Sequence, residues 1–185
     1  PPIAKTVVSE SGELLYTGDE IQYGQRAWLA AGGQQVGSVW GHGAYLAPDW
    51  SADWLHREAL ALREKLAQYH YQQSFETLGV GQQAEIGALL KQEMRTNRYD
   101  AATDTLTVSD LRAEAIRAVA AHYNSLFGMD PAFNELREQY AMAHNSLPSS
   151  DDRHALTGFF FWSAWSATTD RPGETNLTYT NNWPH

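Results

Sequence analysis

The segment from residue 32 to residue 50 constrains the fold of this chain more than any other. It reads GGQQVGSVWGHGAYLAPDW, and its glycines, tryptophans and proline follow neither the 3.6-residue period of a helix nor the alternation of a strand. Glycine is used where the backbone takes positive φ or passes close to another group, and aromatic side chains in such a loop usually bury themselves. We therefore expect an ordered loop that the neighbouring helices hold in a defined shape.

Signals for helices and short strands divide the remaining sequence. β-prone runs at residues 4–9 and 14–16 predict a two-stranded element, and the change of pattern at residues 98–108 predicts a small hairpin. We expect a single, mainly α domain over residues 1–185 with a small β element. Apolar residues at steps of three and four, preceded by capping residues, predict helices that begin near Thr17, Ser51, Ser109, Asp130 and Pro148, with another around residues 84–97. The same periodicity places Leu29 and Tyr69 on the buried faces of the first two helices.

The charge balance and the lack of cysteine exclude several classes of function. The chain has 22 acidic and 13 basic residues, a formal charge of −9 and no cysteine. Nucleic acids and anionic membranes are bound through clustered Lys and Arg, so the acidic balance argues against both as partners. Without cysteine there are no disulfides, thiolate zinc sites, iron–sulfur clusters or haem groups attached through thioethers.

The apolar segments and the chain ends suggest a soluble piece of a longer protein. The longest apolar run, residues 158–167, has about half the roughly 20 residues that a membrane-spanning helix requires. The chain starts at Pro1 without a methionine and stops at His185 without a tail. The aromatic residues 159–165 are interpreted mainly as core, with contact to a partner or to a membrane boundary as the alternative.

The residues alone indicate no catalytic group. The seven histidines include no His-Glu-x-x-His motif and no pair at i, i+4, so we expect them to be scattered surface or half-buried residues. The serine-nucleophile elbow and the glycine motifs for phosphates or dinucleotides are also missing. Asp49, Asp53, Asp100 and Asp104 are explained equally well as helix caps and turn residues. This pattern is typical of a helix-rich domain and argues against a free-standing enzyme.

Three blocks of sequence carry a resemblance to a known family. They are VWGHGAYLAPDWSADWLHRE at residues 39–58, LTGFFFW at residues 156–162 and TYTNNWPH at residues 178–185. With them the chain resembles the hydrophilic domain of the quinol-dependent nitric oxide reductases, single-chain membrane enzymes of the haem–copper oxidase superfamily. The resemblance implies a domain between the first and second membrane helices of the parent chain, on the periplasmic side of the bacterial inner membrane.

The two-subunit relatives of that family have a cytochrome c subunit in the equivalent place. Its haem motif, Cys-x-x-Cys-His, precedes a block that residues 41–48 resemble, and at the same spacing this chain has Gly33, Val36 and Gly37. The resemblance therefore implies a cytochrome c-like helical fold that lacks haem and binds no cofactor of its own. Because protein interiors are close-packed, side chains must then fill the haem cavity. The side chains expected there are Trp28, Trp40 and Trp54.

The resemblance also implies a calcium site in the intact enzyme. In the two-subunit relatives the Gly and Tyr of this block help to bind calcium between the subunits, which places Gly43 and Tyr45 as ligands here. Calcium takes about six to eight oxygen ligands, so the membrane part would supply the others. His42 replaces a glutamate of the relatives and makes the local charge less favourable to a cation. Haem b and the non-haem iron belong, by the same resemblance, to the membrane helices.

The expected role is a structural, catalytically inactive cap on an enzyme that reduces two NO to N2O and water with electrons from quinol. Its partners would be the membrane domain of the same chain and, in a homodimer, a second copy of the parent. Two alternatives stay open. An electron-transfer domain would hold haem non-covalently through a histidine and Met94, Met129 or Met142. A stand-alone binding module would use the aromatic loop as its pocket.

Overall fold

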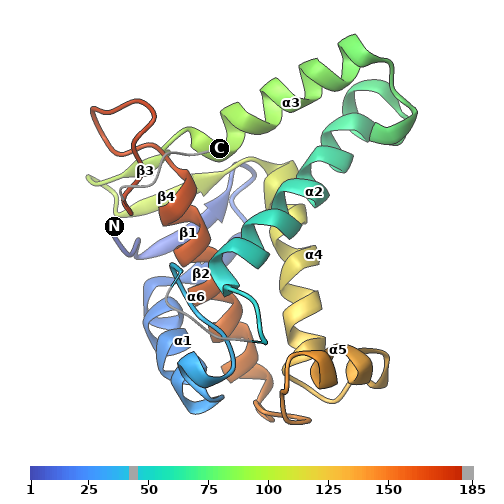
Figure 1. Cartoon of the computed structure of the whole chain (residues 1–185). Helices are drawn as coiled ribbons and strands as arrows, with labels where there is room; N and C mark the ends of the chain where they lie inside the picture. The colour runs from blue at the N-terminus through green and yellow to red at the C-terminus, as the bar shows by residue number, and fades with distance from the viewer. Residues whose placement is uncertain (42–45, 181–185) are drawn as a thin grey trace.

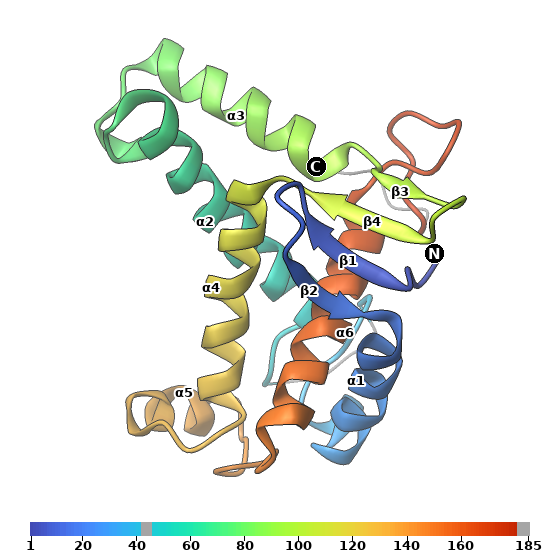
Figure 2. The same cartoon turned by 180° about the vertical axis from the view of Figure 1, so that it is seen from behind.

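The computed structural model describes residues 1–41 and 46–180. In this part of the chain six α-helices pack around an aromatic core, and a small four-stranded sheet lies on one side of them (Figures 1 and 2). Both the mainly α character and the small β element predicted from the sequence are confirmed. The elements, with the 3-10 turns labelled η, are β1 (Thr6–Ser9), β2 (Leu14–Thr17), α1 (Gly18–Ala30), η1 (Gly33–Gln35), α2 (Trp50–Tyr71), η2 (Phe75–Thr77), α3 (Val80–Arg95), β3 (Tyr99–Asp100), β4 (Thr105–Val108), α4 (Asp110–Leu126), η3 (Pro131–Phe133), α5 (Asn134–Gln139) and α6 (Ser150–Thr168).

The two predicted hairpins join into one sheet with the strand order β2-β1-β4-β3. β1 pairs antiparallel with β2, and β3 pairs antiparallel with β4, as expected for hairpins. The join between them is a parallel pairing of β1 with β4, in register from Thr6 opposite Thr105 to Ser9 opposite Val108. Because the paired segments are far apart in the sequence, no local pattern predicts this join.

Helix α6 is the centre of the domain. In both views α1 lies on one side of α6, while α2 and α4 lie on the other, and the sheet covers a further face (Figures 1 and 2). Most of its residues from Ala155 to Thr168 are buried, as expected for a helix that is apolar on all sides. The hydroxyl of Tyr16 in β2 donates a hydrogen bond to Thr157 over 3.0 Å and fixes the sheet against it. The aromatic run predicted as core is therefore confirmed as core.

A second apolar cluster lies away from α6. It joins the C-terminal half of α2 to α3 and to the start of α4 through Leu62, Leu66, Ile86, Met94 and Ala115. The α2–α3 hairpin that carries it projects beyond the rest of the molecule (Figure 2). α3 is accordingly buried along one narrow stripe, at Ile86 and Met94.

The local predictions hold with specific exceptions. Thr17 and Glu20 form the predicted capping box at α1. α2 begins one residue before the predicted cap at Ser51, because the side chain of Asp49 accepts the Ala52 N–H and caps the helix instead. The helix predicted from Asp130 opens with the 3-10 turn η3.

Two residues assigned to buried faces are exposed. Leu29 is 58% exposed and Tyr69 is 67% exposed. Both residues lie in the last turns of their helices. The periodicity identifies which face of a helix is apolar, but it does not indicate how far along the helix the neighbouring elements cover that face. In the part of the chain that the structure describes, no helix combines the length and the apolar character needed to cross a membrane.

Candidate functional site

The glycine-rich loop leaves α1 through two residues with positive φ. Gly32 has φ of 117° and Gly33 has φ of 53°, conformations that favour glycine. The turn η1 follows, and the N–H groups of Val36 and Gly37 both donate to the carbonyl of Gly33. The three positions aligned with the haem motif, Gly33, Val36 and Gly37, therefore form one compact turn.

Gly37 lies directly against the indole of Trp50. A Cβ placed on Gly37 would be 2.2 Å from Nε1 of Trp50, closer than real Cβ atoms approach a neighbour. Trp50 is the first residue of α2 and is fully buried. The space beside Gly37 is therefore occupied by a tryptophan ring.

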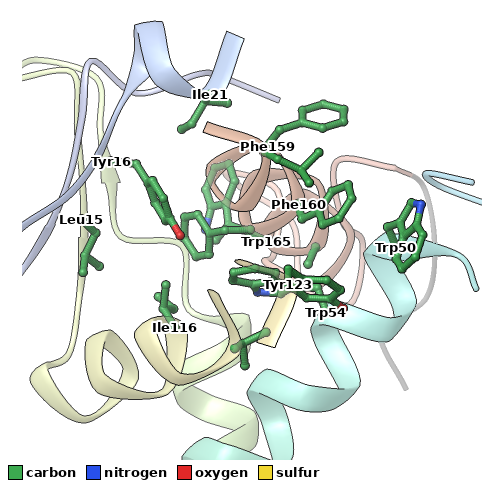
Figure 3. Packing of buried hydrophobic residues seen from close by; sticks show 14 of the residues in the cluster. Leu15, Tyr16, Ile21, Trp50, Trp54, Ile116, Tyr123, Phe159, Phe160 and Trp165 are labelled. Carbon is green, nitrogen blue, oxygen red and sulfur yellow. The ribbon is translucent and has the colours of Figure 1, made fainter. Parts of the chain in front are cut away.

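Aromatic rings of α4 and α6 pack against Trp50, and Figure 3 shows two of them, Tyr123 and Phe160. The indole stacks on Phe160 of α6, with ring centroids 5.5 Å apart and an angle of 12° between the planes. Tyr123 and Phe127 of α4 meet it edge-on, and Trp54, one turn further along α2, stacks on Tyr123. These offset and edge-to-face arrangements are the favourable ones for aromatic pairs.

The tryptophans expected to fill the haem cavity divide into two groups by their exposure. Trp54 is 0% exposed and Trp28 is 7% exposed, so both lie in the core. Trp40 is 37% exposed and lies at the edge of the core. Its indole Nε1 donates to the carbonyl of Ser163 over 2.9 Å, and its ring contacts Trp162. Sequence reasoning missed Trp50, because the pattern of the segment assigns it to the end of the loop and not to the first helical position.

Asp49 holds the two described ends of the loop together. Its Oδ2 accepts hydrogen bonds from the Ser38 hydroxyl, over 2.8 Å, and from the Gly41 N–H, over 2.6 Å. Its Oδ1 accepts the Ala52 N–H and so caps α2. The Trp50 N–H donates to the Ser38 carbonyl over 2.7 Å and closes the same junction through the backbone. One carboxylate thus fixes both the loop and the start of the helix that carries Trp50.

Replacing Asp49 by alanine is expected to lower the free energy of unfolding by about 1–2 kcal/mol, because the helix cap and the loop contacts are lost together. Asp49→Asn keeps a capping oxygen and should cost less. Urea denaturation of the two variants, compared with the unchanged chain, measures the difference. Equal losses for the alanine and asparagine variants would contradict the assigned role of the side-chain oxygens.

The predicted calcium ligands, Gly43 and Tyr45, lie outside the described residues, as does His42. Within the described ranges, no group of three or more His, Asp or Glu side chains is arranged to hold a metal ion. The adjacent carboxylate of Asp49 already accepts hydrogen bonds at both oxygens. The described part of the loop therefore supplies no ligand set of its own.

The methionines considered as haem ligands are scattered over the fold. Met94 belongs to the second apolar cluster and Met142 to the main core, while Met129 is 71% exposed.

A buried ion pair links α2 and α4 beneath the aromatic cluster. Arg112 Nε donates to Glu58 Oε1 over 2.7 Å, and both side chains are almost completely buried. Trp54 Nε1 donates to the other oxygen of Glu58 over 2.9 Å. Arg112 also donates to the carbonyl of Glu93 at the end of α3. The pair therefore ties three helices at one point of the interior.

A second polar group borders the core at His122 of α4. Its Nε2 is buried and has no hydrogen-bond partner among the described residues, and its ring contacts Tyr123 and Phe133 edge-on. Burial, together with the Arg57 guanidinium, lowers the pKa of His122 from 6.5 to about 4. Arg57 itself is held by Asp53, which also accepts the Tyr123 hydroxyl.

This depressed pKa predicts a loss of stability in mild acid. Between pH 6.5 and about pH 4 the unfolded chain takes up a proton at His122 that the folded chain does not, so stability falls as the pH falls through this window. Because the ring is only partly buried, we expect about 1–2 kcal/mol. Denaturation from pH 7.5 to pH 4 should show that His122→Asn removes this part of the acid dependence. If the free energy of unfolding of both proteins falls equally with pH, His122 does not cause this part of the acid dependence.

The structure defines this chain as a mainly α domain with a small sheet, an aromatic core and a glycine-rich loop beside that core. The family model described as the cytochrome c-like domain of the NorB chain of nitric oxide reductase matches residues 4–185. The chain therefore belongs to this family and is a component of nitric oxide reductase, an oxidoreductase. A search of curated proteins found no match.

Proposed function

We propose that this domain is the extracytoplasmic cap of a quinol-dependent nitric oxide reductase and that it holds no haem. The parent enzyme would reduce two NO to N2O and water, using haem b and non-haem iron in its membrane helices. The contact between Gly37 and Trp50 is the observation that carries the haem-free part of the proposal. Any calcium bound at Gly43 and Tyr45 would need further ligands from the membrane part.

The packing around Trp50 supports a structural role. A haem attached as in c-type cytochromes needs two cysteines and a histidine, and the chain has no cysteine. A side chain at position 37 would overlap a fully buried ring. Trp50, Trp54, Tyr123 and Phe160 form a continuous set of ring contacts next to Gly37, so side chains fill the interior there.

The segments near Pro2 and Tyr179 both contact α6, which supports a domain whose two connections to the membrane part lie on the same side. Trp162 Nε1 donates to the carbonyl of Pro2 over 2.8 Å, and Trp165 contacts the ring of Tyr179. Both tryptophans belong to α6, about one helical turn apart. Pro2 and Tyr179, near the two ends of the described residues, thus meet the same part of one helix. A domain inserted between two membrane helices must return its chain to the side that it left, and this arrangement fits that requirement.

A thiol placed on the exposed tip of α3 tests the location. Val80 is 86% exposed and the chain has no cysteine, so Val80→Cys in the complete subunit adds one accessible thiol. A membrane-impermeant maleimide should label this variant in spheroplasts, above the background given by the unchanged subunit. Labelling only after lysis would place the domain in the cytoplasm and refute the cap proposal.

A further inference from the structure

A cleft of about 920 Å³ opens between α2, α3 and α6. This volume is within the range of small-molecule sites, which is roughly 300–1,000 Å³. The side chains that line its described part are mainly apolar. They are Leu55 and Ala59 of α2, Leu90 and Met94 of α3, Ala167 of α6 and Trp40 of the loop.

Two cationic residues of α3, Lys91 and Arg95, line the cleft. Lys91 of α3 is exposed and lines the cleft, and within the described residues no carboxylate lies at ion-pair distance from its Nζ. Lys65 on α2, in contrast, pairs with Glu114 over 3.2 Å. The acidic residue of the cleft, Asp49, already accepts hydrogen bonds at both of its carboxylate oxygens. In a chain with a formal charge of −9, the cleft therefore presents an unpaired positive charge beside an apolar surface.

The wall of α3 is kept open by a glycine. Gly87 lies within the helix and lines the cleft, and a Cβ added to it would meet no atom within 4 Å. Glycine inside a helix is less favourable than alanine, and nothing in the packing of Gly87 requires it. A side chain at this position would extend into the open space of the cleft.

We propose that this cleft binds a single-chain amphipathic anion, with the alkyl chain on the apolar wall and the anionic head on Lys91. The apolar surface favours burial of the ligand's alkyl chain, and the ammonium group of Lys91 favours a negatively charged head group. The ligand enters as a free monomer and not as part of a bilayer. This inference does not depend on the proposed function of the domain.

Calorimetric titration of the 185-residue chain with dodecanoate, below its micelle concentration, tests the proposal. We expect saturable binding of one molecule. Lys91→Glu should weaken it at least about tenfold, because it places a carboxylate beside the anionic head group. Lys5→Glu makes the same charge change at an exposed lysine outside the cleft and should leave binding unchanged.

Substitutions at two glycines of α3 test the location. Gly87→Phe should abolish binding, whereas Gly81→Phe, also in open space but outside the cleft, should not. Circular dichroism should show both variants folded, because neither position is crowded. Absent binding by the unchanged chain, equal binding by the two phenylalanine variants, or binding of phosphatidylglycerol vesicles but not of monomeric dodecanoate would each overturn the proposal.

Discussion

Replacing Trp50 by alanine is expected to lower the free energy of unfolding by about 3–5 kcal/mol, the range for truncating a large buried aromatic side chain. The ring is 0% exposed and packs between Phe160, Tyr123 and Phe127, so its removal leaves a cavity that three helices line. Tyr69→Ala in the same helix is the control, because that ring is 67% exposed and its loss should cost less than about 1 kcal/mol.

Gly37 provides a second test of the same packing. Gly37→Ala is expected to cost about 1–3 kcal/mol, since its Cβ would overlap the fixed indole. In the Trp50→Ala background the same substitution should cost much less, because the cavity accepts the added methyl group. A double-mutant cycle by urea denaturation measures this coupling. Additive losses would show that Gly37 and Trp50 do not constrain each other.

Breaking the Glu58–Arg112 pair from one side is expected to cost about 3–5 kcal/mol, because it leaves the other charge buried without a partner. Glu58→Gln leaves the guanidinium without a carboxylate, and Arg112→Met leaves the carboxylate with only the indole N–H of Trp54 as a side-chain donor among the described residues. Replacing both residues, Glu58→Leu with Arg112→Met, should cost less than either single change. Urea denaturation of the three variants measures these losses.

The surface pair between Lys65 and Glu114 is the matched control for this prediction. It also joins α2 to α4, but its side chains are 31% and 51% exposed. Lys65→Gln should therefore cost about 0–1 kcal/mol. If the buried and the surface pairs give equal losses, burial does not determine the strength of this link.

Local signals in the sequence were sufficient for most of the elements. Thr17 with Glu20, Ser109 and Ser149 each cap a helix whose start the sequence places within a residue or two. These predictions succeed because a cap acts over three residues and its chemistry can be read directly. Asp49 was interpreted as either a cap or a turn residue, and it serves both as a helix cap and as the closing contact of the loop.

Contacts between distant segments could not be predicted in the same way. Glu58 and Arg112 meet across 54 positions of sequence, and neither residue carries a local pattern that indicates burial. The parallel pairing of β1 with β4 is likewise set by tertiary packing. Trp50 is a core residue because it is the first residue of α2, and the sequence pattern places the start of that helix one residue later, at Ser51. The resemblance to the family identified the loop, but it did not identify Trp50 as the side chain that occupies the core beside it.

The absorption spectrum of the 185-residue chain mixed with equimolar haemin tests the central claim most directly. Because Trp50 and its neighbours occupy the interior beside Gly37, we expect the protein to leave gel filtration without a Soret band, with the added haemin separated from it. A Soret band that accompanies the protein in one-to-one ratio would contradict the haem-free cap. It would support instead an electron-transfer domain that binds haem non-covalently.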